Sequence, residues 1–214
     1  MVATTHYFNR KLHSLLGVIP IGTFLLVHLS VNYLATRGPE AFEKGAGFIR
    51  NLPFLPVLEW GLIFLPLLYH AIYGIYIAFQ AQNNVTTYGY FNNVKFLIQR
   101  YTGLITLLFV IWHVWETTIQ VRLGLKELNF DLMTNILSSK VSMTFYLIGV
   151  ISAIFHFSNG LWTFLITWGI TIGPRSQRIS NYFFMTVFVL LSIVAVLILF
   201  SYVSPEYVNQ VTLG

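Results

Sequence analysis

The chain has 214 residues, of which 56% are hydrophobic and only 9% are Asp, Glu, Lys or Arg, and its mean hydropathy is +0.71. A soluble domain carries about 25% charged residues, so this composition excludes an ordinary water-facing surface. The lack of Cys excludes a disulfide framework, a thiolate-bound iron–sulfur cluster, a zinc ribbon and covalently attached haem. We therefore expect an all-α polytopic membrane protein that forms one membrane domain over residues 1–214.

Five apolar stretches, separated by charged residues, are each long enough to cross a bilayer, which takes about 20 helical residues. Trimming them at aromatic belts and turn residues predicts helices over residues 14–34, 57–79, 101–121, 142–168 and 182–203. The first stretch is longer than the core of a signal peptide and shows no small-residue cleavage site before Arg37. We expect it to be retained.

The charged residues are distributed unevenly over the two sides of a five-span bundle. The N-terminal side holds six cations: Arg10, Lys11, Lys95, Arg100, Arg175 and Arg178. The opposite side holds another six, Arg37, Lys44, Arg50, Arg122, Lys126 and Lys140, and all seven acids lie there or at its edge: Glu40, Glu43, Glu59, Glu116, Glu127, Asp131 and Glu206. Equal cation counts leave the positive-inside rule undecided. A purely cationic N-terminal face would attract an acidic partner or anionic headgroups, which favours a cytoplasmic N-terminus.

Each of the first four predicted spans contains one histidine: His28, His70, His113 and His156. Ionisable residues inside a membrane are costly and usually functional. The spacing is regular, with 42 residues from His28 to His70 and 43 from His113 to His156. The segment His-Ala-Ile-Tyr-Gly from His70 resembles His-Phe-Ser-Asn-Gly from His156, which indicates a helical hairpin used twice. The repeat and the helical rise pair His28 with His113 in one layer and His70 with His156 in the other.

Two facing imidazoles, present twice, fit haem iron with axial His on both faces, and without Cys the haem must be of the b type. Zinc or copper would recruit a third or fourth ligand in the same layer. A proton relay through the histidines is the remaining functional alternative. Gly17 lies three turns before His28 on the same face, at the depth of the other layer, where it would admit a porphyrin or simply a neighbouring helix.

Two acids share a helix face with a candidate ligand. Glu59 lies eleven residues before His70, and Glu116 lies three residues after His113. Either could exchange protons with a quinone, or could be an interfacial carboxylate that meets headgroup water. On the cationic side, Arg10, His13 and Ser14 are candidates to bind haem propionates, although such residues also serve as headgroup anchors. His6 receives no role.

Five segments carry a resemblance to a known family: residues 10–17 (Arg-Lys-Leu-His-Ser-Leu-Leu-Gly), 68–74, 111–115, 155–162 and 167–178. With the span around His28, they resemble the dihaem cytochrome b membrane anchor of succinate:menaquinone oxidoreductase over residues 7 to about 203. Glu59 matches an acid of that family, whereas Glu116 stands where an amide is expected. The extension after Ser204 has no counterpart.

The resemblance implies a five-helix anchor in the bacterial cytoplasmic membrane, with a cytoplasmic N-terminus and two haems b. Their axial ligands would be His28 with His113 and His70 with His156. It further implies docking of a flavoprotein and an iron–sulfur subunit on the acid-free face, and electron flow through the haems to menaquinone near the opposite surface. Lipid is the other expected partner, and nucleic acid is not one. The alternatives are a fumarate reductase, hydrogenase or formate dehydrogenase anchor, or a haem-free transporter with a histidine relay.

Overall fold

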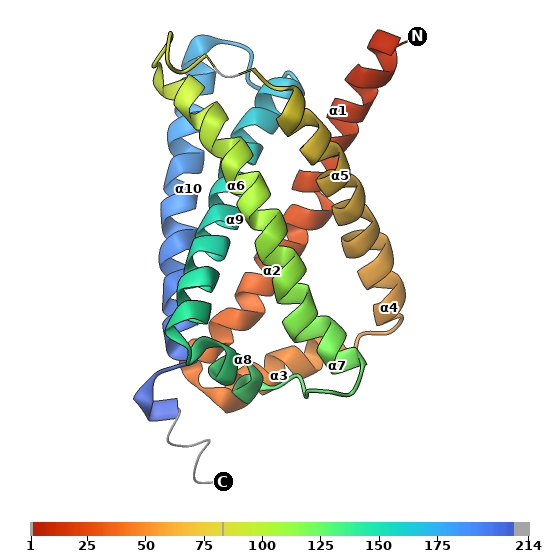
Figure 1. The fold of residues 1–214 in the computed structure, drawn as a ribbon, viewed down its shortest axis with the longest axis vertical. Helices are drawn as coiled ribbons and strands as arrows, with labels where there is room; N and C mark the ends of the chain where they lie inside the picture. The colour runs from red at the N-terminus through yellow and green to blue at the C-terminus, as the bar shows by residue number, and fades with distance from the viewer. Residues whose placement is uncertain (1, 83, 208–214) are drawn as a thin grey trace.

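The computed structural model describes residues 2–82 and 84–207. Its regular elements there are helical, and five helical segments are long and apolar enough to cross a membrane: His6–Arg37, Leu55–Gln80, Phe91–Arg122, Lys140–Thr167 and Pro174–Tyr207. They run alternately up and down, with α1 at one end and two short helices, α3 and α8, across the other (Figure 1). The predicted all-α polytopic membrane fold with five spans is confirmed.

Three of the five spans combine several elements. The first consists of α1 (Val2–Val18), α2 (Pro20–Tyr33) and the 3₁₀ turn η1 (Leu34–Arg37). The second consists of α4 (Leu55–Leu58), the π-helical η2 (Glu59–Phe64) and α5 (Leu65–Gln80). The third consists of α6 (Phe91–Val114), the π-helical η3 (Trp115–Ile119) and α7 (Gln120–Arg122). The fourth and fifth are the single helices α9 (Lys140–Thr167) and α10 (Pro174–Ser201), which pack against each other.

Three predicted helix starts were too late. The first, third and fifth helices were expected from residues 14, 101 and 182, whereas α1 begins at Val2, α6 at Phe91 and α10 at Pro174. The prediction stopped at charged residues, but these helices continue past them toward the N-terminal end. The remaining predicted boundaries lie within three residues of the observed ends, with Ser201, the last residue of α10, taken as the end of the fifth helix.

Lys95 also corrects the predicted charge map. It was counted as part of the cationic N-terminal face, but only 2% of its surface is exposed. Its Nζ donates a hydrogen bond to Asn181 of α10 and lies 3.4 Å from the ring centroid of Trp162 on α9. Lys95 therefore connects α6 to α9 and α10, and its buried charge is not accessible to a partner at the surface.

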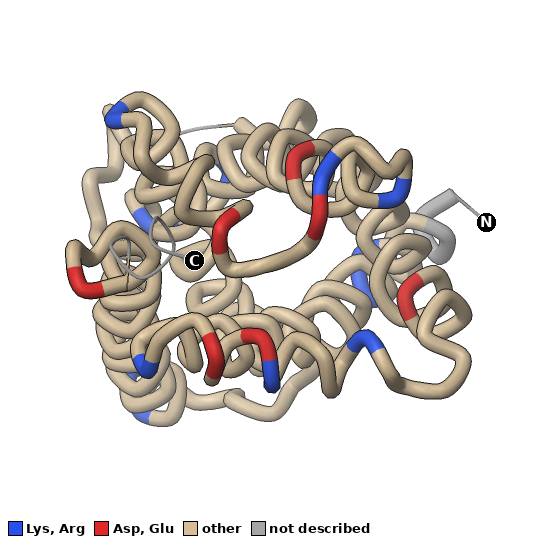
Figure 2. Tube along the Cα trace, turned by 90° about the horizontal axis from the view of Figure 1, so that it is seen from below, with Lys and Arg blue, Asp and Glu red and all other residues tan. Residues whose placement is uncertain are grey.

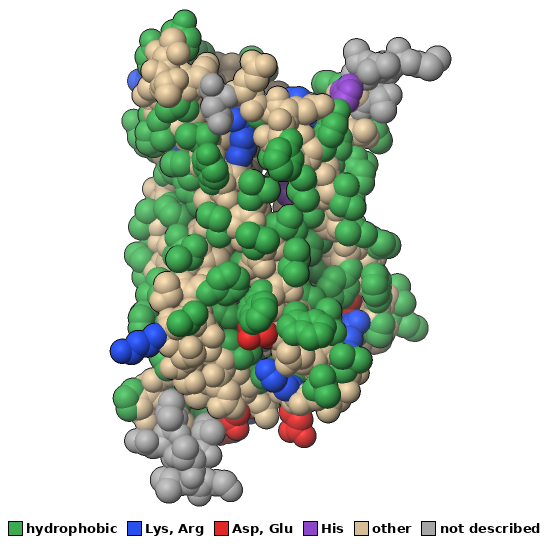
Figure 3. All heavy atoms as spheres, in the orientation of Figure 1, with side chains coloured by type: hydrophobic (Ala, Val, Ile, Leu, Met, Phe, Trp, Pro, Cys, Tyr) green, Lys and Arg blue, Asp and Glu red, His purple; other side chains and the backbone are tan. Residues whose placement is uncertain are grey.

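The acidic residues lie toward the end that carries α3 (Pro39–Arg50) and α8 (Phe130–Leu137), which we call the acidic end (Figure 2). On the face shown in Figure 3, red side chains appear only in the lower part, and hydrophobic side chains cover the middle. This pattern suits a surface that faces lipid between two aqueous layers.

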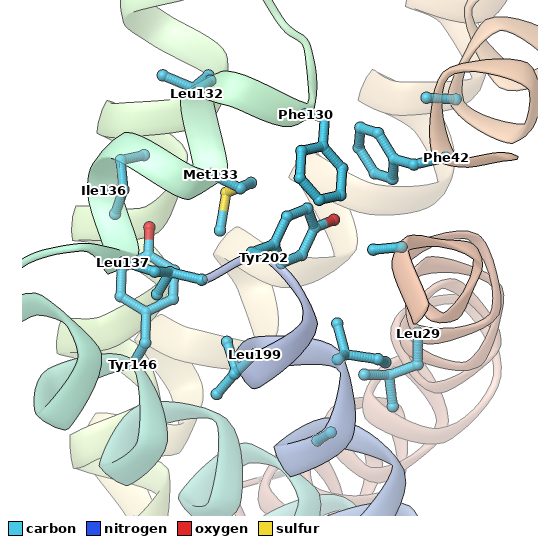
Figure 4. Packing of buried hydrophobic residues seen from close by; sticks show 14 of the residues in the cluster. Leu29, Phe42, Phe130, Leu132, Met133, Ile136, Leu137, Tyr146, Leu199 and Tyr202 are labelled. Atoms are coloured by element: carbon cyan, nitrogen blue, oxygen red, sulfur yellow. The ribbon is translucent and has the colours of Figure 1, made fainter. Parts of the chain in front are cut away.

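Aromatic residues of the buried hydrophobic cluster also pack together at the acidic end. Phe130 and Tyr202 have ring centroids 4.9 Å apart, and Phe42 contacts both (Figure 4). Asn129 caps α8 by accepting a hydrogen bond from the Leu132 amide at 2.9 Å. Glu43 of α3 accepts one from the Phe130 amide at 2.7 Å. The connections at this end thus fold as a packed lid over the bundle.

Candidate functional site

The four span histidines lie in two pairs inside the bundle. The first pair is His28 on α2 and His113 on α6, with ring centroids 5.8 Å apart and ring planes at 81°. The second pair is His70 on α5 and His156 on α9, with centroids 6.1 Å apart and planes at 86°. The first pair lies nearer the acidic end and the second nearer the N-terminal end. These are the neighbours that the sequence spacing predicts.

Hydrogen bonds orient both imidazoles of the second pair. Nδ1 of His70 lies 2.9 Å from the carbonyl oxygen of His13, and Nδ1 of His156 lies 3.0 Å from that of Gln99. A carbonyl oxygen only accepts, so each Nδ1 must carry the proton. Each Nε2 then keeps its lone pair, which is the tautomer that a metal-ligating histidine needs.

Two glycines make room for these imidazoles. A Cβ added to Gly17 would lie 2.8 Å from Nδ1 of His70, and one added to Gly103 would lie 2.8 Å from Cε1 of His156. Both distances are shorter than real side-chain contacts, so any other residue would push the ring away. Gly17 was expected to admit either a porphyrin or a neighbouring helix; in the structure the group that meets it is the imidazole of His70 on the neighbouring α5.

The surroundings of the second pair follow a single 86-residue offset. Four positions around the first hairpin's second-pair ligand have a counterpart 86 residues later: His13 and Gln99, Gly17 and Gly103, His70 and His156, Gly74 and Gly160. The sequence analysis missed Gln99 and Gly103. Applying the His70-to-His156 offset to His13 and Gly17 would have found both.

The two halves differ at the residue that accepts the Nδ1 proton. The His13 ring stacks on His70 with centroids 3.9 Å apart and planes at 8°. Its counterpart Gln99 instead donates from Nε2 to the His156 carbonyl and accepts from Asn159. Of the other proposed propionate residues on α1, Arg10 is exposed and Ser14 is half-buried.

In the first pair, a side chain orients the His113 ring. Nδ1 of His113 lies 3.4 Å from the hydroxyl of Tyr146, which donates at 2.9 Å to Oε2 of Glu116. Tyr146 is 1% exposed. The sequence analysis missed Tyr146, because nothing in the local spacing links a residue on α9 to the face of α6.

Both acids named from the sequence lie in π-helical segments near the acidic end. Glu59 is the first residue of η2 and forms an ion pair with Arg122 of α7; Glu116 is the second residue of η3. π-Helical turns occur frequently at functional sites. The pairing of Glu59 with Arg122 could not be read from sequence, since 63 residues separate them.

A cavity of about 470 Å³ opens beside Glu116 at the acidic end. Eight of its ten lining residues are polar or charged, and the ten come from η3, the following loop, α8 and the start of α9: Glu116, Lys126, Glu127, Asn129, Asp131, Leu132, Asn135, Ile136, Ser139 and Ser142. Glu116 therefore borders the cavity on one side and contacts Tyr146 on the other.

Among residues 2–82 and 84–207, the structure contains no group of three or more His, Asp or Glu side chains that could hold a bare metal ion. Each histidine pair provides two donors only. Such a site suits a metal that arrives with its other ligands.

Comparison with known proteins agrees with this architecture. Residues 85–199 match the family described as succinate dehydrogenase/fumarate reductase transmembrane subunit. The succinate dehydrogenase cytochrome b558 subunit of Bacillus subtilis (strain 168) is 56% identical over 203 residues, which is 95% of this chain and 100% of that protein. The chain therefore belongs to the succinate dehydrogenase/fumarate reductase transmembrane subunit family.

Proposed function

We propose that this chain is the dihaem cytochrome b anchor of a succinate:quinone oxidoreductase, which conducts electrons from an iron–sulfur subunit to menaquinone. The observation that carries the proposal is the presence of two facing histidine pairs, supplied by four different spans at two depths. The name of the 56% identical relative, a cytochrome b subunit of succinate dehydrogenase, supports it.

The geometry of both pairs fits a haem. Nitrogens bound to opposite sides of one metal at about 2 Å place two imidazole centroids about 6 Å apart. The observed separations are 5.8 and 6.1 Å. Each pair would contribute two nitrogen donors to the iron, and a porphyrin would supply its remaining ligands. Bound haem b supplies reversible one-electron chemistry.

The protein's own residues hold and orient the ligands. The carbonyls of His13 and Gln99 keep the Nδ1 protons of His70 and His156 in place, and Gly17 and Gly103 allow the rings their positions. A histidine relay would need these protons to move, whereas a backbone carbonyl cannot pass a proton on. This disfavours a haem-free proton transporter. Arg10, His13 and Ser14 remain our candidates for binding propionates at the N-terminal end.

We further propose that the N-terminal end faces the cytoplasm and receives the flavoprotein and iron–sulfur subunits. In the described chain, this end carries Arg and Lys side chains without acids, since all seven acids lie toward the acidic end, and this suits an acidic partner surface. Menaquinone would then react near the acidic end, where Glu59 would exchange its protons. The ion pair with Arg122 holds the Glu59 carboxylate at the end of the second span.

Haem content of the purified complex tests the ligand assignment. We expect His28→Ala or His113→Ala to remove one of two haems, and His70→Ala or His156→Ala to remove the other, with two distinct spectra for the two groups. His6→Ala should retain both. Loss of both haems from every variant, or a grouping of His28 with His156, would contradict the assignment.

Quinone turnover tests Glu59 separately. Glu59→Gln retains the shape of the side chain and removes the proton-accepting carboxylate, so we expect the complex to keep two haems and lose most of its quinone reduction. Succinate oxidation with an artificial acceptor should remain. Unchanged quinone reduction would remove Glu59 from the mechanism.

A further inference from the structure

We propose that Glu116 is a positioning residue that acts through Tyr146 on His113 and lowers the midpoint potential of the first histidine pair relative to the second. The proposal rests on the proposed function, because a midpoint potential exists only if each pair holds a haem. It assigns a role to an acid that occupies a position where the family resemblance predicts an amide.

The connection is a chain of two hydrogen bonds between three helical elements. Tyr146 on α9 donates its hydroxyl proton to Glu116 on η3 at 2.9 Å. The same oxygen is then free to accept from Nδ1 of His113 on α6, at 3.4 Å. Tyr146 belongs to the buried cluster of the acidic end (Figure 4) and contacts Phe109 and His113 edge-on. Its position is therefore fixed by packing.

The carboxylate at the end of this chain has no cationic partner among the described residues. The two ion pairs there are Arg50 with Glu43 and Arg122 with Glu59. Lys126 lines the same cavity as Glu116, but so do Glu127 and Asp131. These three residues together carry a net negative charge, so they do not cancel the negative charge that Glu116 places near the first pair.

The second pair has a different acceptor chemistry. The Nδ1 protons of His70 and His156 go to neutral backbone carbonyls. The Nδ1 proton of His113 goes to a phenol polarised by a carboxylate. A hydrogen-bond acceptor that is itself bonded to a carboxylate would make the imidazole a stronger electron donor. A stronger donor would stabilise the more positive, oxidised iron. This difference between the acceptors predicts a lower midpoint potential at the first pair than at the second. Because the acceptor of the first pair is a side chain, substitutions can test the prediction.

The test is potentiometric titration of the two haems, followed by visible spectra, in the intact purified complex. In Glu116→Gln we expect the potential of the first pair to rise enough to change its reduced-to-oxidised ratio at least tenfold, which is about 59 mV for one electron. The second pair should not move. Tyr146→Phe should raise the same potential, and the double variant should add little, because both changes cut one chain.

Two matched variants separate this effect from general charge and from packing. Glu127→Gln removes a charge from the same cavity without touching Tyr146 and should leave both potentials near their original values. Glu116→Asp keeps the carboxylate and should restore most of the original potential. An equal shift in Glu127→Gln would overturn the proposal, as would two retained haems with unmoved potentials in both Glu116→Gln and Tyr146→Phe.

The haem count distinguishes this failure from failure of the proposed function. If the unmodified complex binds no haem, the proposed function is wrong. If it binds two and only the potentials fail to respond, the proposed function stands and the role of Glu116 is wrong. Because Phe keeps the ring packing of Tyr146, the Tyr146→Phe variant decides the matter if Glu116→Gln loads poorly.

Discussion

The two ends of the bundle hold their histidines by different means. At the N-terminal end, backbone carbonyls and glycines surround the second pair, and the arrangement repeats after 86 residues. At the acidic end, the first pair is linked to a tyrosine and an acid, beneath a lid of packed aromatic residues. At the N-terminal end, where backbone atoms hold the histidines, we expect a substitution to disturb the second pair only where the new side chain has no space. At the acidic end, where side chains hold His113, we expect the effect of a substitution to depend on the group that it removes.

The largest change in haem content is expected from Gly103→Ala. Its new Cβ would lie 2.8 Å from Cε1 of His156. Such overpacking typically lowers stability by about 1–3 kcal/mol when neighbouring groups must move. We expect the complex to lose the haem of the second pair and keep that of the first, measured as haem per complex and by the remaining spectrum.

Gly61→Ala is the matched control, since no atom lies within 4 Å of its added Cβ. It should retain two haems. Gly17→Ala should reproduce the loss seen in Gly103→Ala, because it approaches His70 in the same way. Full haem content in both Gly17→Ala and Gly103→Ala would show that these rings are not confined by the glycines.

Phe130→Ala tests the packed lid of the acidic end. Phe130 is 2% exposed and contacts Phe42 and Tyr202, and truncation of such a ring costs about 3–5 kcal/mol. We expect that loss in the free energy of unfolding in mixed micelles, with both haems still bound before unfolding. Phe79→Ala, at a ring that is 82% exposed, should change stability by less than about 0.5 kcal/mol.

The sequence was sufficient for the features that depend on one helix or on the repeat. Apolar length gave five spans, and the spacing of His28, His70, His113 and His156 gave the two neighbouring pairs that the structure contains. The acids also lie toward the end where charge counting placed them. Each of these features follows from helical rise and from a chain that alternates direction.

Contacts between distant helices could not be predicted in this way. Tyr146 reaches Glu116 and His113 from another span, and Lys95 is buried by residues of two other helices. A single helix predicts which residues share its face, but not which residue of a neighbour lies opposite. The exception is instructive: Gln99 and Gly103 were predictable, because the duplicated hairpin repeats even the contacts around His70.

The smallest effect is expected from a substitution that tests whether the packed lid influences His28, the ligand beneath it. The Tyr202 hydroxyl donates at 2.9 Å to Asn32 Oδ1, and Asn32 donates at 2.8 Å to the His28 carbonyl. Tyr202→Phe keeps the buried ring and removes one hydrogen bond, so we expect a loss of about 1 kcal/mol in the free energy of unfolding. The His28 ring itself makes no part of this link, so the spectrum of the first pair should stay unchanged. A loss as large as that of Phe130→Ala would mean that the hydroxyl, rather than ring packing, holds the lid in place. An altered spectrum would mean that the lid positions His28 through the backbone carbonyl of His28. Both ends of the bundle would then position a histidine through backbone groups.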